Sequence, residues 1–180
     1  MTEQPIELSS LIQQAQQAYE GKDFSRSAEL FRGIEGQLVQ QGNLTQAAEM
    51  ANNRCVALLQ SGKPAEALEA ARSTEHIFAN AGDLRHQAMA CANQAAALVD
   101  LKRSDEALTL YQKSVDLFTQ IGENEMQSVV LQSISSIFFH KMDFISALSI
   151  MVDALNLQSH LGVKERVLKW FLGVACRVVK

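Results

Sequence analysis

The sequence contains few of the residues that interrupt helices. Its 180 residues include only two prolines, Pro5 and Pro64, so few breaks in secondary structure are expected. Aromatic residues make up 6% of the chain and hydrophobic residues 47%, which is ordinary for a soluble globular protein. A chain of this length forms one domain of ordinary size or one short array of repeats.

Signals for export and for membrane insertion are also lacking. The N-terminal stretch MTEQPIELSS has no basic region followed by an apolar region, so no signal peptide is predicted. The longest apolar stretch, FISALSIMVDALNL, contains Asp153 and is too short and too polar to span a bilayer. The three cysteines, Cys55, Cys91 and Cys176, form no CxxC pair. We therefore expect reduced thiols in a cytoplasmic protein.

Charge excludes some partners and is unevenly distributed. The formal net charge of −4 at pH 7 gives no general attraction to nucleic acid or to anionic membranes. The segment 164–180 contains five basic residues and one glutamate, a net charge of +4, which leaves −8 for the rest of the chain. The C-terminal segment therefore differs in character from the sequence before it.

Motifs of catalytic and cofactor sites are missing. The sequence contains no G-x-G-x-x-G, G-x-x-x-x-G-K-[ST], H-E-x-x-H or G-x-S-x-G. No two of the four histidines have the spacing of metal ligands, and core packing explains Cys55 and Cys91. We therefore predict a protein that is not an enzyme and has no metal or cofactor.

Glycine recurs at a fixed interval along the chain. The glycines in register are Gly42, Gly82, Gly122 and Gly162, each forty positions beyond the one before. Each follows a segment with helical apolar periodicity, and glycine is the usual residue just past a helix end because it enters the left-handed conformation cheaply. The interval defines four repeats, at 7–46, 47–86, 87–126 and 127–166, each with two helical segments. The predicted helices cover 6–20, 24–41, 45–60, 64–81, 84–100, 104–121, 124–140, 144–161 and 164–179.

Small residues also recur in register, which allows two helices to approach closely. In the first helix of each repeat the series is Ala15, Cys55, Ala95, Ser135 and then Ala175. In the second helix it is Ser27, Ala67, Ala107 and Ala147.

At these positions the sequence resembles the tetratricopeptide repeat (TPR) family. The segments EALTLYQKSVDLF (106–118) and PAEALEAARSTEHIF (64–78) are especially similar to the second helix of its pattern. The period is longer than the family's usual value of about 34, as in the 40-residue subset that includes kinesin light chain and peptide-pheromone receptors. The family's leucine position holds Gln14, Arg54 and Gln94 in the first three repeats. The resemblance implies one all-α domain over 1–180, a right-handed superhelix of antiparallel helix pairs with nine helices.

The resemblance also implies a binding mode, in which the first helix of every repeat lines a concave groove that holds a peptide or protein segment. The candidate peptide-binding residues are Gln13, Asn52, Asn53, Asn93 and Gln132. Their side-chain amides can donate to and accept from a peptide backbone at once. For Asn53 and Asn93, local capping or packing is an equal alternative.

Charge on the predicted lining narrows the choice of ligand. The lining of the four repeats contains no Lys or Arg, which excludes the family's carboxylate clamp and a nucleic-acid groove. Its charged residues Glu20, Glu49 and Asp100 favour a neutral or basic ligand.

The segment 164–180 corresponds to the first helix of a fifth repeat. It is apolar over more than half of its residues, so three roles stay open: a cap on the fourth repeat, a symmetric dimer interface, or docking on a membrane surface by its basic stripe. The candidate dimer interface consists of Trp170, Phe171, Val174 and Val178. A homo-oligomerising scaffold is therefore the alternative function.

Overall fold

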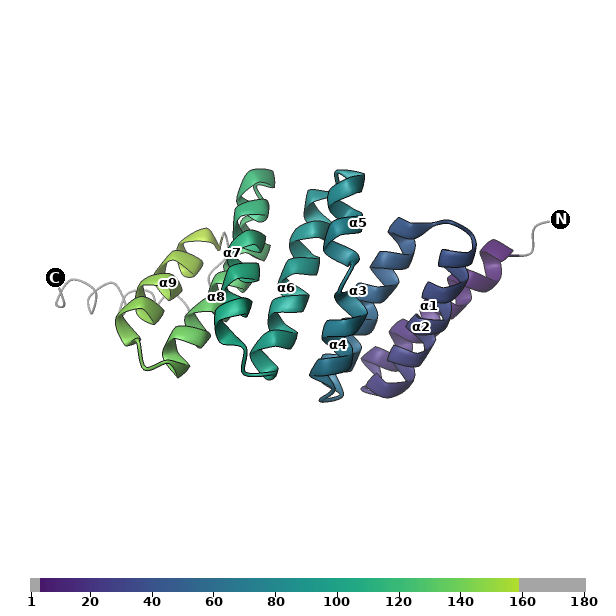
Figure 1. The fold of residues 1–180 in the computed structure, drawn as a ribbon, viewed down its shortest axis with the longest axis horizontal. Coiled ribbons are helices and arrows are strands. Elements are labelled where there is room, and N and C mark those ends of the chain that lie inside the picture. The colour runs from purple at the N-terminus through teal and green to yellow at the C-terminus, as the bar shows by residue number, and fades with distance from the viewer. Residues whose placement is uncertain (1–3, 159–180) are drawn as a thin grey trace.

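The computed structural model describes residues 4–158, and all regular structure in this range is helical. The helices are α1 (Gln4–Glu20), α2 (Phe24–Gln40), α3 (Leu44–Gln60), α4 (Pro64–Ala71), α5 (Thr74–Ala81), α6 (Leu84–Asp100), α7 (Ser104–Ile121), α8 (Asn124–His140) and α9 (Phe144–Leu157). They lie side by side in chain order along the long axis of the molecule (Figure 1). The predicted all-α class is confirmed.

Antiparallel helix pairs stack into a right-handed superhelix, as predicted. We call α1, α3, α6 and α8 the A helices, and α2, α4 with α5, α7 and α9 the B helices. Each A helix packs against its own B helix, and α3, α6 and α8 also pack against the B helix of the preceding repeat. The buried apolar residues form four clusters distributed along the array. Cohesion is therefore a series of contacts between neighbouring repeats.

The glycines in register have the predicted conformation. Gly42, Gly82 and Gly122 follow B helices with φ of +75°, +71° and +71°, in the region that other residues enter only at a cost. Gly162 lies outside the described residues. A second left-handed position recurs in the turn from each A helix to its B helix. It is filled by Lys22, Gly62, Lys102 and Met142, with φ of 63°, 74°, 63° and 63°.

Within the helix pairs, the small residues mark a point of close approach. In the first repeat Ser27 Oγ donates to the carbonyl oxygen of Ala15 at 2.9 Å. In the fourth repeat Ser135 Oγ donates to the carbonyl oxygen of Ala147 at 2.7 Å. Ser27 belongs to a B helix and Ser135 to an A helix. The first and fourth repeats therefore have the same contact between their two helices, but the hydroxyl donor comes from the B helix in one and from the A helix in the other.

A second point of close approach shows the same exchange. Ser114 Oγ on α7 donates to the carbonyl oxygen of Ala88 on α6, and Ser128 Oγ on α8 donates to that of Ala154 on α9, both at 2.8 Å. The four hydroxyl groups are buried, and a buried hydroxyl needs a partner. The short side chains allow the two helices to come close enough to provide one.

The prediction of a continuous helix over 64–81 is wrong. The helix is interrupted after Ala71, and its halves are α4 and α5. The carbonyl oxygen of Ala71 accepts hydrogen bonds from Thr74 Oγ1 at 2.8 Å and from Gln94 Nε2 at 2.9 Å. Side chains that enter the hydrogen-bond ladder are a known cause of helix kinks. Because Gln94 comes from α6, the break depends on the neighbouring repeat.

The predicted helix over 144–161 ends earlier, at Leu157. Gln158 is extended, with ψ of 122°, and its Nε2 donates to Ser128 Oγ at 3.1 Å. This contact of the Gln158 side chain with α8 coincides with the end of α9. The predicted helix over 164–179 lies outside the described residues. No helix within residues 4–158 is long and apolar enough to cross a membrane.

Candidate groove on the concave face

The candidate groove lies between the A helices of the first two repeats, α1 and α3. Two clefts open there, with volumes of about 450 Å³ and about 320 Å³. Cleft I is lined by Gln16, Tyr19, Glu20, Phe31, Asn53 and Val56. Cleft II is lined by Leu8, Ser9, Ile12, Leu38, Gln46, Glu49 and Met50. Both clefts therefore have walls from the two A helices and one residue each from α2.

The residue that α2 contributes forms the floor of each cleft. Phe31 and Leu38 are 3% and 1% exposed and are seven residues apart, so they lie on one face of α2 two turns apart. The prediction of the groove from A helices alone missed both residues. Their helical spacing in a B helix was visible in the sequence, but it does not show which side of the packed pair they reach.

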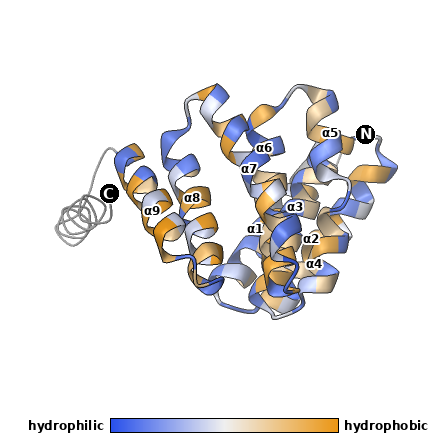
Figure 2. Cartoon of the chain, turned by 60° about the vertical axis from the view of Figure 1, so that its left-hand side comes forward, coloured by the Kyte–Doolittle hydropathy of each residue, from blue (hydrophilic) through white to orange (hydrophobic). Residues whose placement is uncertain are grey.

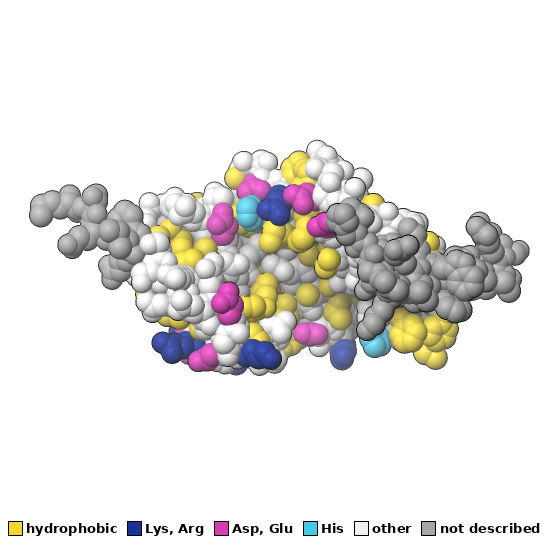
Figure 3. All heavy atoms as spheres, turned by 180° about the vertical axis from the view of Figure 1, so that it is seen from behind, with side chains coloured by type: hydrophobic (Ala, Val, Ile, Leu, Met, Phe, Trp, Pro, Cys, Tyr) yellow, Lys and Arg dark blue, Asp and Glu magenta, His cyan; other side chains and the backbone are white. Residues whose placement is uncertain are grey.

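Exposed side-chain amides border the apolar floor. Asn53 and Gln16 are exposed and line cleft I, and Gln13 is exposed one turn before Gln16 on α1. Figure 3 shows a hollowed face with hydrophobic side chains in its middle and both acidic and basic side chains around them. The structure thus brings Asn53 and Gln16 together, with Gln13 close to the boundary between the two clefts.

Asn52 has a different environment from Asn53. It is 5% exposed, and neither its Oδ1 nor its Nδ2 has a hydrogen-bond partner within residues 4–158. Ala48, one turn earlier on α3, packs in a cluster with Ala90 of α6, and Cys55 Sγ lies 3.9 Å from the Asn93 carbonyl oxygen. Asn52 therefore lies between two contacts of α3 with α6, beneath the surface of the groove.

The other two predicted residues lie further along the array and line neither cleft. Asn93 is half-buried on α6. Gln132 is half-buried on α8, and its Nε2 lies 3.4 Å from Ser128 Oγ. The predicted set is therefore spread over four A helices, and of its members only Asn53 lines one of the two clefts.

Cleft I and cleft II, called the paired clefts below, carry negative charge. Neither Lys nor Arg lines them. The carboxylates of Glu20 and Glu49 form no ion pair within residues 4–158. An unpaired carboxylate beside an apolar floor favours a ligand that carries both a cation and an apolar side chain.

The chain is similar to known proteins in both sequence and fold. The family model described as soluble NSF attachment protein (SNAP) matches residues 2–166, most of the chain. The chain belongs to the SNAP family. Among solved structures, BtubC (BKLC) from P. vanneervenii is similar, with a TM-score of 0.71 and 18% identity over 89% of this chain and 67% of that chain. At this identity the likeness shows the fold alone. No curated protein matches the chain.

These comparisons confirm the TPR-like helical repeat in its general form. The narrower resemblance, to the 40-residue subset of kinesin light chain and pheromone receptors, stays a prediction. The four candidate residues of the dimer interface, Trp170, Phe171, Val174 and Val178, lie outside the described residues.

Another cleft of this SNAP-family chain opens on the opposite side, between α2 and α4, with a volume of about 390 Å³. Its charged lining consists of Glu29, Glu66, Glu69, Arg32, Arg54 and Lys63. Lys63 pairs with Glu66, and Arg54 pairs with the nearby Glu35 at 3.2 Å. Because the opposite charges balance, this cleft lacks the single sign of the paired clefts, and the latter are the better candidate.

Arg54, at the position where the TPR pattern has leucine, forms an ion pair with Glu35 of α2. Both side chains are mostly buried, at 19% and 23% exposure. Burial raises the pKa of the Glu35 carboxyl, and the charge of Arg54 offsets only part of this shift. The pair therefore ties α2 to α3 at a cost in desolvation.

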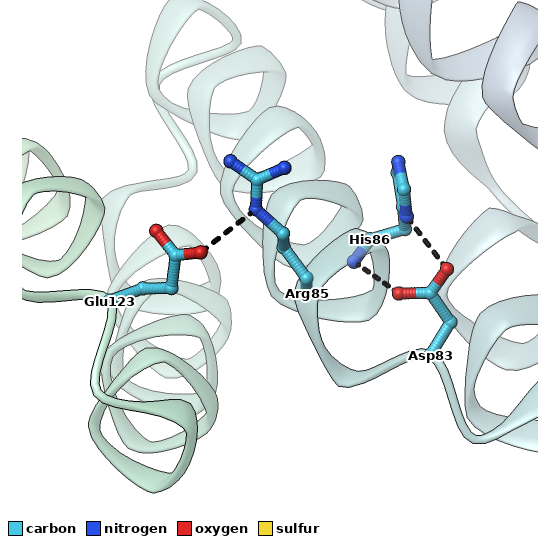
Figure 4. Close-up of polar contacts among 4 residues, drawn as sticks. All are labelled: Asp83, Arg85, His86 and Glu123. Carbon is cyan, nitrogen blue, oxygen red and sulfur yellow. Dashed lines mark hydrogen bonds and ion pairs between the residues drawn. The ribbon is translucent and has the colours of Figure 1, made fainter.

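A cluster of charged residues at one edge ties α6 to its neighbours (Figure 4). Asp83 accepts from the backbone N–H of His86 at 3.0 Å and lies 2.7 Å from His86 Nδ1. Arg85 Nε lies 3.1 Å from Glu123 Oε1, at the start of α8. The His86 ring stacks on Phe78 with centroids 5.3 Å apart. These contacts cap and brace helices, which is a structural role.

The buried thiols are poor nucleophiles. Burial raises the pKa of Cys55 and that of Cys91 to about 12, so the thiolate fraction at neutral pH is very small. No group of three or more His, Cys, Asp or Glu side chains in the described part of the chain is arranged to hold a metal ion.

Proposed function

We propose that this SNAP-family chain is a non-enzymatic interaction module that binds a peptide or protein segment in its concave groove, in the cytoplasm. The observation that carries the proposal is the open groove between α1 and α3, where exposed amides border an apolar floor. The family description, an attachment protein, supports a protein partner. The free thiols Cys55 and Cys91 support a reducing compartment.

In this proposal Gln13, Asn53, Asn93 and Gln132 contact the ligand from successive A helices. An amide that is exposed in the free protein loses water when a ligand covers it, so it contributes only if it bonds to the ligand. Asn52 would meet a ligand only if the contact between α3 and α6 opened.

The test uses peptides selected on the purified protein from a random display library. In the variant Asn53→Ala/Asn93→Ala, affinity for the selected peptides should fall, since each lost hydrogen bond costs about 1 kcal/mol. The thermal unfolding temperature should change little. A matched control, Glu29→Ala/Arg32→Ala, changes exposed residues on the opposite side and should leave affinity unchanged. Unchanged affinity in the asparagine variant, together with lost stability, would show that these asparagines are structural.

A homo-oligomerising scaffold is the second candidate function. The observation that favours it is an exposed apolar cluster at the α8–α9 turn: Phe139, Met142, Phe144 and Ile145 are 58%, 72%, 49% and 68% exposed. Hydrophobic residues also cover much of α9 in Figure 2. Apolar surface of this kind commonly marks an interface, and a two-fold dimer is the commonest assembly.

A further inference from the structure

The two clefts between α1 and α3 lie in line along the groove. On α1, cleft II is lined by residues 8–12 and cleft I by residues 16–20. At about 1.5 Å of rise per residue, their centres are about 12 Å apart. Each cleft has its own apolar floor residue, Leu38 or Phe31, and its own carboxylate, Glu49 or Glu20. The groove therefore offers the same pair of groups twice.

This repeated arrangement points to one class of ligand. We propose that the paired clefts bind an extended segment of a protein partner that carries two apolar side chains four residues apart, with Lys or Arg beside them. The inference rests on the proposed function and specifies its ligand.

The spacing of the clefts favours an extended segment. Residues four apart in an extended chain lie on the same face and about 13 Å apart, which matches the separation of the clefts. In an α-helix, four residues span only about 6 Å, and seven are needed to span about 10 Å. The two conformations therefore require different sequence spacings.

The amides that border the clefts favour the same choice. Gln13, Gln16 and Asn53 are exposed, and each can donate and accept at once. An extended segment has backbone N–H and C=O groups free for such partners, whereas a helix has already paired most of its own. Amide side chains on both walls are therefore more useful to an extended ligand.

Charge complementarity determines the residues that flank the two apolar side chains. Glu20 and Glu49 form no ion pair within the described residues, and the lining of both clefts lacks Lys and Arg. A ligand cation near each cleft would meet a carboxylate that has no competing partner, and an acidic ligand would be repelled.

The experiment selects peptides from a random display library and then measures synthetic copies by fluorescence anisotropy. Selected sequences should share two apolar residues four apart with Lys or Arg near them. Moving the second apolar residue to three or seven positions from the first should weaken binding at least roughly 10-fold, because it no longer reaches its cleft. Equal binding at a spacing of seven would overturn the extended ligand in favour of a helix.

The carboxylates are tested with variants that keep their shape. Glu20→Gln/Glu49→Gln should lower the affinity for the selected peptides roughly 5-fold and reduce the salt dependence of binding. Glu29→Gln/Glu69→Gln is the matched control, since both carboxylates line the cleft on the opposite side, and it should have no effect. An equal effect of Glu29→Gln/Glu69→Gln would overturn the assignment of these clefts.

The outcomes separate this inference from the proposed function. The inference would be wrong, and the proposed function would remain supported, under one result. Peptide affinity would fall in Asn53→Ala/Asn93→Ala but would not change in Glu20→Gln/Glu49→Gln or with the spacing of the apolar residues. If no peptide is selected, or if no change in the groove weakens the selected ones, both fail.

Discussion

Single residues in the turns determine where one helix stops and the next begins. The turn from each A helix to its B helix has one residue with φ of 63° to 74°. Three of the four are not glycine, so the conformation is imposed by the packing of the helix pair and not chosen by the residue. Gly62 is the one of these four positions that holds glycine, the residue type that adopts this conformation at low cost.

Gly62 and Gly36 should respond to alanine in opposite directions. At each of them an added Cβ would have open space, so only the backbone conformation differs. Gly62→Ala places a side chain at φ of +74° and should destabilise the fold by about 1 kcal/mol. Gly36→Ala lies within α2 and should stabilise it by about 0.5–1 kcal/mol. Urea unfolding measures both, and equal signs would contradict this account of the turn.

A second prediction at the residue scale concerns acid and the helix caps. Asp83 is partly buried, which opposes ionisation, but hydrogen bonds from the backbone and ring of His86 lower the pKa of its carboxyl below the ordinary 3.8. A lowered folded pKa means that this stabilisation is complete above the unfolded pKa and is lost as pH falls through the folded value. Asp83→Ala should therefore cost about 1 kcal/mol at pH 5 and less at pH 3.

Asn43 provides the control for this cap. It occupies the same register position one repeat earlier and accepts from the backbone N–H of Gln46 at 3.3 Å, but its amide does not titrate in this range. Asn43→Ala should lose the same stability at pH 5 and pH 3. A cost of Asp83→Ala that stays constant between these pH values would show that the charge of Asp83 contributes nothing.

At the scale of elements, the sequence predicts the regular helices closely and the irregular ones poorly. The predicted ranges 84–100, 104–121 and 124–140 match α6, α7 and α8, because glycine position and apolar spacing are local signals. The break after Ala71 was missed because one of its two donors is the local Thr74 hydroxyl, which also fits a continuous helix, and the other, Gln94, comes from α6.

Tertiary contacts also decide which residues form the candidate site. The amides on the A helices follow from the repeat register, but the floor residues Phe31 and Leu38 reach the groove from α2. Asn52 and Asn53 are neighbours in sequence, yet one is buried and the other exposed. Successive helix residues point about 100° apart around the axis, and the packing of α3 against α6 decides which of the two is covered.

The break between α4 and α5 can be tested through its hydroxyl donor. Thr74 is 2% exposed and donates to the carbonyl oxygen of Ala71. Thr74→Val keeps the shape and removes the donor, which should cost about 1–2 kcal/mol of unfolding free energy. Thr109→Val removes an exposed hydroxyl on α7 that bonds Asp105 at 3.2 Å, and it should change stability by less than about 0.5 kcal/mol. Similar costs for both would show that the buried hydroxyl does not hold the break.

At the scale of the whole molecule, the last described helix pair, α8 and α9, has a surface that no following described helix covers. In a stack of repeats every helix pair covers its neighbour, so the last pair exposes apolar surface unless something covers it. Among the described helices, α9 packs mainly against α8, and the exposed cluster from Phe139 to Ile145 lies at this end. The following segment, 164–180, is itself apolar over more than half of its length, so it would bring more apolar surface than one face of α9 can cover.

We therefore expect a chain of residues 1–180 to form a dimer that dissociates on dilution, through a surface that includes Phe171. Phe171→Asp places a carboxylate in that surface and should yield a monomer, because an unpaired charge is costly to bury. Sedimentation velocity at several concentrations measures the change, and circular dichroism should show that most of the helix content persists. Leu44→Asp is the control, because Leu44 is exposed to a similar extent, 53%, at the start of α3, far from the α8–α9 turn in sequence, and it should leave the dimer intact. A wild-type chain that stays monomeric at high micromolar concentration would instead assign 164–180 to capping the fourth repeat.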